Sequence, residues 1–128
     1  MTQSDCPFCN VDQSKVLLAN EHAMAFPDGF PVTPGHSLIV PKRHISSLFE
    51  ATKEETAALF DLVAEMRELL LTDNAPDGFN VGINDGAAAG QTVMHLHIHL
   101  IPRYAGDTED PRGGVRWIMP VKAPYWKK

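Results

Sequence analysis

The sequence has few cysteines, no long apolar run and no concentration of basic residues, and each shortage excludes a class of protein. Cys6 and Cys9 are the only cysteines, and a disulfide between them would close a loop too small to add much stability. No uninterrupted apolar stretch approaches the roughly 18 residues of a membrane-spanning helix. The N-terminus also lacks a basic segment followed by an apolar one. We therefore expect a cytoplasmic protein that does not bind a membrane.

Basic residues are too scattered for a protein that binds the backbone of a nucleic-acid polymer. The chain carries 11 Lys and Arg against 16 Asp and Glu, a formal net charge of -5 with neutral histidine. Sequence-independent binding to nucleic acid needs clustered positive charge, so we expect no such partner, and any bound phosphate must be held locally. With 128 residues, 44% of them hydrophobic, the chain is expected to form one domain over residues 1–128.

What the sequence does contain is a succession of short apolar runs and one long amphipathic segment. Strands are expected at 15–19, 22–26, 37–40 and 79–83 and within 91–103, with a short turn of helix at 45–48. Thr52 and Glu55 have the spacing of a capping box, which predicts a helix from there to about Leu71. Its apolar residues recur every three or four positions, as Leu59, Leu62, Val63, Met66 and Leu70. This pattern predicts a helix packed on a sheet, in the α+β class.

The strongest chemical signal is the stretch 91–103, QTVMHLHIHLIPR, in which His95, His97 and His99 alternate with apolar residues. Strict alternation predicts a strand, and the three imidazoles would then share one face about 6.8 Å apart. Each histidine has two ring nitrogens that need partners when buried, so three in a row are too many for ordinary packing. We interpret the row as a site.

Two chemistries fit such a row. One is a three-histidine metal site with an open position, but residues 95 and 99 of a straight strand lie about 13 Å apart, too far for both to reach one ion. The other is a nucleophilic middle imidazole whose neighbours supply protons or hydrogen bonds, which suits an extended row. A chance alternation of histidines on a solvated face is the remaining alternative.

A loop of small residues, NDGAAAG at 84–90, leads directly into the histidines. Residues 86–90 allow close approach of the backbone, and exposed amides there could hold phosphate oxygens without a net positive charge. Gln91 and Thr92 add side-chain donors. A glycine-bearing loop alone is weak support, but before three nucleophile-capable side chains it favours phosphoryl or nucleotidyl transfer to histidine.

Together these residues resemble the histidine triad (HIT) family of nucleotide hydrolases and transferases. Residues 95–101 fill the family pattern His-φ-His-φ-His-φ-φ, in which φ is apolar. The segment PGHSLIVPKRH at 34–44 and the order of strands and helix are also similar, so the resemblance covers almost the whole chain. It implies an antiparallel sheet of about five strands with one long and one short helix packed on it, usually in a homodimer.

The resemblance implies cleavage at the α-phosphate of adenosine-type conjugates, either dinucleoside polyphosphates or nucleoside phosphoramidates. By motif position, His97 would attack phosphorus and form a covalent nucleotidyl-histidine intermediate, which water then hydrolyses. His99 would contact the phosphate and help the leaving group depart, while His95 and His36 would orient the row. Mg²⁺ could accompany the substrate.

Other positions match the family's contacts to substrate. Asp28 corresponds to the group that binds the ribose hydroxyls, and Asn84 and Gln91 correspond to phosphate-loop contacts. Phe8 and Phe26 could line the base pocket, although a core position is at least as good an interpretation of each. The remaining candidates at the loop are Gly90 and Thr92. The segment PRYAGD after the triad resembles the diadenosine-polyphosphate branch, which more often has Gln where Asn84 stands.

The motif CPFC at 6–9 resembles either a redox motif or half of a metal site. A redox CxxC belongs between a strand and a helix, and neither is predicted here. Bacterial-type relatives carry a zinc site from a CxxC and two distant histidines, which implies Cys6, Cys9, His44 and His95 here. Four such ligands close a tetrahedral, structural site, which would fix an N-terminal loop of residues 1–12. Two free cysteines without metal are the alternative.

A nucleotide-binding or protein-interaction module that keeps the pocket without significant hydrolysis is the alternative to the enzyme. Residues 105–128 predict an irregular tail, to which we assign no catalytic role.

Overall fold

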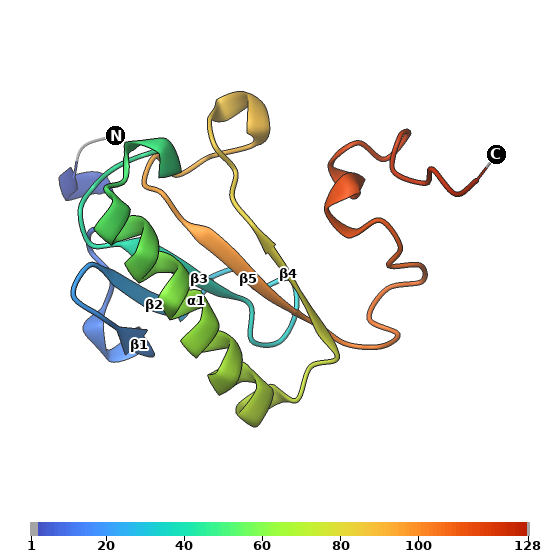
Figure 1. Cartoon of the computed structure of the whole chain (residues 1–128), viewed down its shortest axis with the longest axis horizontal. Helices are drawn as coiled ribbons and strands as arrows, with labels where there is room; N and C mark the ends of the chain where they lie inside the picture. Colours follow the sequence, from blue (N-terminus) through green and yellow to red (C-terminus); the bar gives the residue numbers. More distant parts are fainter. Residues whose placement is uncertain (1–2, 128) are drawn as a thin grey trace.

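A five-stranded antiparallel sheet with one long helix across one face forms the frame of the computed structural model (Figure 1). The strands are β1 (Leu18–Ala19), β2 (Ala23–Pro27), β3 (Ser37–Pro41), β4 (Gly78–Gly82) and β5 (Ile98–Arg103). They lie side by side in the order β1-β2-β3-β5-β4. Helix α1 spans Lys53–Asn74 and connects β3 to β4. The predicted α+β fold is confirmed.

The structure describes residues 3–127. The first two residues of the predicted N-terminal loop and the last residue of the predicted tail lie outside that range. Short 3-10 helices lie between the main elements: η1 (Gln3–Asp5), η2 (Gln13–Lys15), η3 (Leu48–Glu50), η4 (Ala87–Ala89) and η5 (Gly114–Ile118). Among the helices of residues 3–127, none combines the length and apolar character needed to cross a bilayer.

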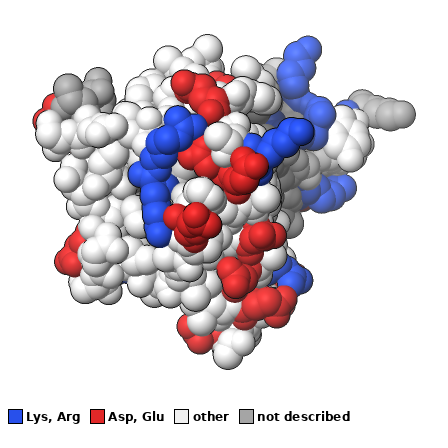
Figure 2. All heavy atoms as spheres, turned by 60° about the vertical axis from the view of Figure 1, so that its left-hand side comes forward, with Lys and Arg blue, Asp and Glu red and all other residues white. Residues whose placement is uncertain are grey.

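Helix α1 begins at the predicted capping box. The Thr52 hydroxyl accepts from the Glu55 amide, and the Glu55 carboxylate accepts from the Thr52 amide, so two of the amides at the helix start are satisfied. The predicted apolar stripe packs on the sheet, with Leu59, Leu62 and Met66 fully buried. Acidic side chains spread over the opposite side, with a few basic ones between them (Figure 2). Hydrophobic periodicity therefore identified the buried face correctly.

The other face of the sheet has a second core, and this face carries the site. Met24, Phe26, Leu38 and Val40 are its buried members, and the N-terminal segment covers them with Phe8, Val11 and Val16. His99 of β5 pairs with Leu38 of β3 in the antiparallel register. Directly paired residues point to the same face, so His99 lies on the side of this second core and away from α1.

The predicted strand through the three histidines is wrong in its first half. Strand β5 begins at Ile98, so His95 and His97 precede it. Instead of joining a strand ladder, the Leu96 amide donates to the Ile45 carbonyl at 2.6 Å. The imidazoles are not evenly spaced along one face either, since the rings of His97 and His99 have centroids 5.1 Å apart while His95 turns toward the cysteines. The alternation of histidine and apolar residues predicts an extended chain, but it does not predict which carbonyl groups accept hydrogen bonds from the backbone amides of that chain.

Three further boundaries differ from the sequence prediction by more than one residue, and the first is the end of α1, which lies at Asn74 instead of about Leu71. The first strand is reduced to Leu18–Ala19, because residues 13–15 form η2, which Asp12 caps. The short helix lies at Leu48–Glu50 instead of 45–48, because Ser47 and Glu50 make a second capping box there. The tail beyond β5 contains η5 as its one regular element among the described residues (Figure 1). Residues of η5 lie close to β4.

Candidate active site and adjoining metal centre

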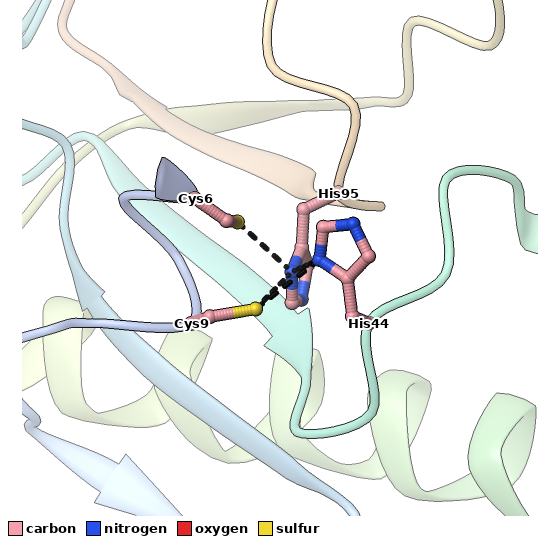
Figure 3. Close-up of side chains that lie close together, drawn as sticks. All are labelled: Cys6, Cys9, His44 and His95. Carbon is pink, nitrogen blue, oxygen red and sulfur yellow. Dashed lines mark hydrogen bonds between the residues drawn. The ribbon is translucent and has the colours of Figure 1, made fainter. Parts of the chain in front are cut away.

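Two cysteines and two histidines converge where the N-terminal segment meets the chain before β5 (Figure 3). The Nδ1 atom of His95 lies 3.4 Å from the Cys6 Sγ and 3.5 Å from the Cys9 Sγ. The Nδ1 atom of His44 lies 3.1 Å from the Cys9 Sγ and 3.2 Å from His95 Nδ1. These four ligand atoms all lie within 4.8 Å of one another. The predicted set is therefore brought together by segments that are far apart in sequence.

This donor set fits zinc. Tetrahedral Zn²⁺ with Zn–N of about 2.1 Å and Zn–S of about 2.3 Å keeps its ligand atoms about 3.4–3.8 Å apart, close to the spacings observed here. The Nε2 atom of His95 donates to the Pro41 carbonyl at 2.8 Å, because a carbonyl can only accept. That bond leaves the lone pair on Nδ1, which faces the other three ligands, as an outer-shell partner does in metal sites. A closed set of two thiolates and two imidazoles is typical of structural zinc.

His95 belongs to both parts of the site. Its side chain lies in the cluster of two cysteines and two histidines, and its backbone carbonyl contacts His97. The His97 Nδ1 donates to the His95 carbonyl at 2.8 Å. A neutral imidazole with its proton on Nδ1 has its lone pair on Nε2, so this bond selects the tautomer in which Nε2 is nucleophilic. His97 is buried, and the Phe8 ring stands edge-on to it with centroids 5.0 Å apart.

His36 and His99 form a directly bonded pair on the other side of His97. The His36 Nε2 and the His99 Nδ1 lie 2.9 Å apart, and the Asp28 Oδ2 lies 3.3 Å from the same His36 nitrogen. Burial lowers the pKa of both His36 and His99, and the charge of Asp28 opposes that shift at each ring. For His99 the charges of His97 and His36 lower the pKa further. The hydrogen bond between His36 and His99 is therefore consistent with the predicted orienting role of His36.

The small-residue loop has a different organisation from the one predicted. Gln91 is buried; its Oε1 accepts from the Gly86 amide at 2.8 Å, and its Nε2 donates to the carbonyls of Ser46 and Val93. Both amide hydrogens are therefore in use, so the prediction that Gln91 donates to phosphate is corrected: it braces the loop. The Gly90 amide bonds within the loop to Ala87, and its φ of 94° favours glycine.

The other predicted contact residues lie at three places. Asn84 is half-buried before the loop turn, and Thr92 is exposed just after it. Phe26 belongs to the second core, and the half-buried Phe8 packs on it with ring centroids 5.7 Å apart. Phe8 also contacts the rings of His95 and His97, so it joins the core to the histidines. The core interpretation holds for Phe26, and Phe8 is both packed and next to the site.

One more group of ligand-type residues lies close together, formed by Asp28, His36 and His99. Two imidazoles and one carboxylate are not the oxygen-rich ligands that Mg²⁺ prefers. Within residues 3–127 the Mg²⁺ prediction therefore has no support from a suitable ligand set.

Several groups that build the site have no sequence signal. The carbonyls of His95 and Pro41 set the histidine tautomers, and every residue carries a carbonyl. Arg43 donates to both oxygens of Glu55, which ties the segment that carries His44 to the start of α1. Arg43, beside the predicted ligand His44, and the capping residue Glu55 are both recognisable in the sequence, but no sequence pattern predicts that they form a salt bridge.

The chain matches the HIT domain over residues 10–106. An uncharacterized HIT-like protein of Mycoplasma genitalium is 38% identical over 107 residues, which are 80% of this chain and 76% of that protein. The adenylylsulfatase HINT3 of Arabidopsis thaliana is 36% identical over 109 residues, 82% of this chain and 55% of its own. The asymmetrical bis(5'-nucleosyl)-tetraphosphatase of Schizosaccharomyces pombe is 36% identical over 94 residues, 73% of this chain and 52% of its own.

Among solved structures, a Zn-bound histidine triad family protein from Mycobacterium smegmatis superposes with a TM-score of 0.75 at 31% identity. The match covers 85% of this chain and 82% of that one. The family match and the zinc-bound relative are thus consistent with a zinc site formed by Cys6, Cys9, His44 and His95.

Proposed function

The chain belongs to the HIT domain family, and from this premise we propose that it is a nucleotide hydrolase or nucleotidyl transferase that acts through His97. The observation that carries the proposal is the Nδ1 bond from His97 to the His95 carbonyl, because it leaves Nε2 as a nucleophile. The adjoining His36–His99 pair can donate a proton to the leaving group and accept one from water. Adenosine-type conjugates cleaved at the α-phosphate are the proposed substrates.

The reaction proceeds in two displacements. The His97 Nε2 attacks the α-phosphorus, the bond from phosphorus to the leaving group breaks, and the leaving group takes a proton from His99. Water then attacks the phosphorus of the nucleotidyl-histidine, one proton of the water passes to His99, and the bond from phosphorus to the His97 Nε2 breaks, so that both histidines are restored and a nucleoside monophosphate is released. Splitting one difficult displacement into two easier ones is the advantage of a covalent intermediate.

The metal cluster has a supporting role. Cys6, Cys9, His44 and His95 would hold zinc, which supplies structural cross-linking with no open coordination position. His95 keeps its place through this cluster and through the Pro41 carbonyl. Its own carbonyl then holds His97 in the tautomer that attacks.

The rest of the site is proposed to bind the nucleotide. Asp28 would accept from the ribose hydroxyls, and Phe8 and Phe26 would border the base. Asn84, Gly90 and Thr92 flank a loop whose remaining amides, such as that of Ala88, would face phosphate oxygens. Named activities of two relatives, an adenylylsulfatase and a dinucleoside tetraphosphatase, support this class of substrate.

The experiment is a substrate panel with separation of products. Dinucleoside polyphosphates, adenosine phosphoramidate and adenylyl sulfate are each incubated with the protein, and released nucleoside monophosphate is measured. Turnover of at least one member that disappears in His97→Ala supports the proposal. Nucleotide binding by calorimetry without turnover on any member would instead favour a binding module.

A homodimer, which the resemblance implies, is part of the proposal. Val81 on the edge strand β4 is 44% exposed, and an edge strand with apolar side chains is a common pairing surface. Light scattering after size exclusion measures the mass in solution, and a monomeric mass at all concentrations tested would reject the dimer.

A further inference from the structure

The Asp28 carboxylate lies against the paired imidazoles of His36 and His99. Its Oδ2 is 3.3 Å from the His36 Nε2 and 3.9 Å from the His99 Nδ1. The three side chains are 15%, 3% and 22% exposed, so water screens these contacts only partly. A carboxylate held this close to two facing ring nitrogens influences which protons those nitrogens can carry.

Hydrogen bonds fix the protons of the neutral pair. The Val32 amide donates to the His36 Nδ1 at 3.1 Å, so a neutral His36 carries its proton on Nε2. That proton points to the His99 Nδ1 at 2.9 Å, which must accept. A neutral His99 therefore carries its own proton on Nε2, the ring nitrogen not bonded to His36.

The hydrogen bond from the Val32 amide to the His36 Nδ1 also rules out Asp28, His36 and His99 as a set of metal ligands. To ligate an ion, the His36 Nε2 would have to lose its proton, and the proton would move to Nδ1. An Nδ1–H would then meet the Val32 N–H donor at 3.1 Å, with no acceptor between them. The geometry points to a proton site at this position.

A proton donor must carry one proton more than this neutral pair. Loss of the Nε2 proton from a neutral imidazole would leave an imidazolate, so His99 can serve a leaving group only as part of a cationic pair. The extra proton lies on the His99 Nδ1, which then faces the His36 Nε2–H across 2.9 Å. Two donors at this distance repel each other unless an acceptor lies beside both, and the Asp28 Oδ2 is that acceptor.

We propose that Asp28 is a positioning residue that lets the His36–His99 pair hold the proton taken by the leaving group. The inference rests on the proposed function and adds a second role to the ribose contact. As the bond from phosphorus to the leaving group breaks, the His99 Nε2 proton passes to the leaving atom. The pair changes from one positive charge to none, with the two remaining protons directed at the Asp28 carboxylate.

The surroundings leave this role to Asp28. Besides Asp28, the titratable neighbours of the pair are His97, whose ring centroid lies 5.1 Å from that of His99, and Asp73 of α1, an exposed residue that lines a cavity of about 190 Å³ with His36 and Asp28. Burial is the main cause that lowers the pKa of His99, the neighbouring His97 and His36 lower it further, and the charge of Asp28 opposes them. Asp28 is itself fixed, since its Oδ1 accepts from the Phe30 amide at 2.8 Å and its amide donates to the His36 carbonyl.

The test compares Asp28→Asn on two substrates that differ only in the leaving group. Asparagine keeps an oxygen for Phe30 and for ribose but removes the charge. Adenosine phosphoramidate needs a protonated amine to leave, whereas the p-nitrophenyl ester of AMP releases a phenolate that departs without a proton. We expect kcat to fall about 100-fold or more on the phosphoramidate and less than about tenfold on the ester. Asp73→Asn, which removes a charge across the same cavity, should leave both values unchanged.

A titration without substrate gives a second readout. Imidazole resonances followed by NMR against pH should show the pKa of His36 and His99 lower in Asp28→Asn than in wild type, because the charge that favours protonation is gone. Equal losses on both substrates, or unchanged imidazole titrations, would overturn the proposal. If wild type cleaves neither compound, the proposed function fails, and the NMR titration still decides the role of Asp28.

Discussion

His97 is oriented by a backbone group. Its Nδ1 bond to the His95 carbonyl is 2.8 Å long and does not depend on the identity of any neighbouring side chain. The ring also packs edge-on against Phe8, which limits its rotation. An imidazole held in one tautomer and one orientation needs less reorganisation on the way to the transition state.

Removal of this imidazole should abolish catalysis and leave the fold intact. For His97→Ala we expect turnover to fall by several orders of magnitude, because nucleophile and intermediate are both lost. Circular dichroism and nucleotide affinity should stay close to wild type. His22→Ala is the matched control, since His22 is a partly exposed histidine outside the site. Comparable turnover in the two variants would contradict the role of His97.

At this scale the sequence predicted which residues meet but not every bond they make. The resemblance to bacterial-type HIT proteins implied a cluster of Cys6, Cys9, His44 and His95, and the structure brings these four residues together. Gln91 was predicted to contact phosphate, but its side chain is used by Gly86, Ser46 and Val93. The motif predicts a side-chain amide at position 91, but it does not predict which of the nearby backbone groups will form hydrogen bonds with that side chain.

The segment between β3 and α1 is held by two successive capping boxes and one arginine. Ser47 with Glu50 caps η3, and Thr52 with Glu55 caps α1. Arg43, next to the metal-cluster residue His44, donates to the Glu55 carboxylate at 2.7 and 2.9 Å. The start of the helix and the position of His44 are therefore mechanically connected.

This connection predicts a defined loss of stability in acid. The bonds from Arg43 and from the Thr52 amide lower the pKa of Glu55 from 4.5 to about 2. A carboxyl with a depressed folded pKa stabilises the protein fully above its unfolded value, and this contribution disappears as pH falls from about 4.5 to 2. Glu55→Gln should cost about 1–2 kcal/mol at pH 7 and flatten the dependence of stability on pH in that window.

Urea unfolding at several pH values measures the effect. Glu68→Gln is the control, because Glu68 is exposed and its pair with Arg67 is screened by solvent. If Glu55→Gln unfolds with the same free energy as wild type at both pH 7 and pH 3, the carboxylate does not anchor this segment.

The start of α1 was predictable because a local signal determines it. The capping box located the start of α1 to the residue, because its partners lie three positions apart in the chain. The start of β5 depends on a bond between Leu96 and Ile45, which are distant in sequence. The start of β5 was therefore predicted wrongly. The start of η3 was also misplaced, although Ser47 and Glu50 form a local capping box there.

Across the whole molecule, the N-terminal segment joins the metal cluster to the face that carries the histidines. Cys6 and Cys9 reach His44 and His95, and Phe8 between them packs on the second core and on His97. A metal bound there would hold the segment and the nucleophile together.

Loss of one ligand should therefore weaken both stability and activity. For Cys9→Ser we expect zinc content near zero by elemental analysis. Stability should fall by about 4 kcal/mol when free zinc exceeds the wild-type Kd a thousandfold. Wild type treated with a chelator should melt like the variant, and the variant should not respond to chelator. Equal melting temperatures with and without zinc in wild type would contradict a structural metal.

Zinc binding should also weaken as pH falls. Burial, followed by the neighbouring Cys6, raises the pKa of the Cys9 thiol, so the metal-free protein keeps that proton at neutral pH and zinc must displace it. Calorimetry in buffers of different ionisation enthalpy counts the protons released. Affinity that does not change between pH 6 and 8, with no proton release, would argue against thiolate ligands.

The most direct test of the account is detection of the covalent intermediate on His97. Protein mixed with a nucleotide conjugate is quenched within the first turnover and examined by intact mass and peptide mapping at alkaline pH, where phosphoramidate bonds survive. We expect a mass gain of one nucleotidyl group located on His97 and absent in His97→Ala. Turnover in the first cycle with no such adduct, or an adduct on another residue, would contradict it.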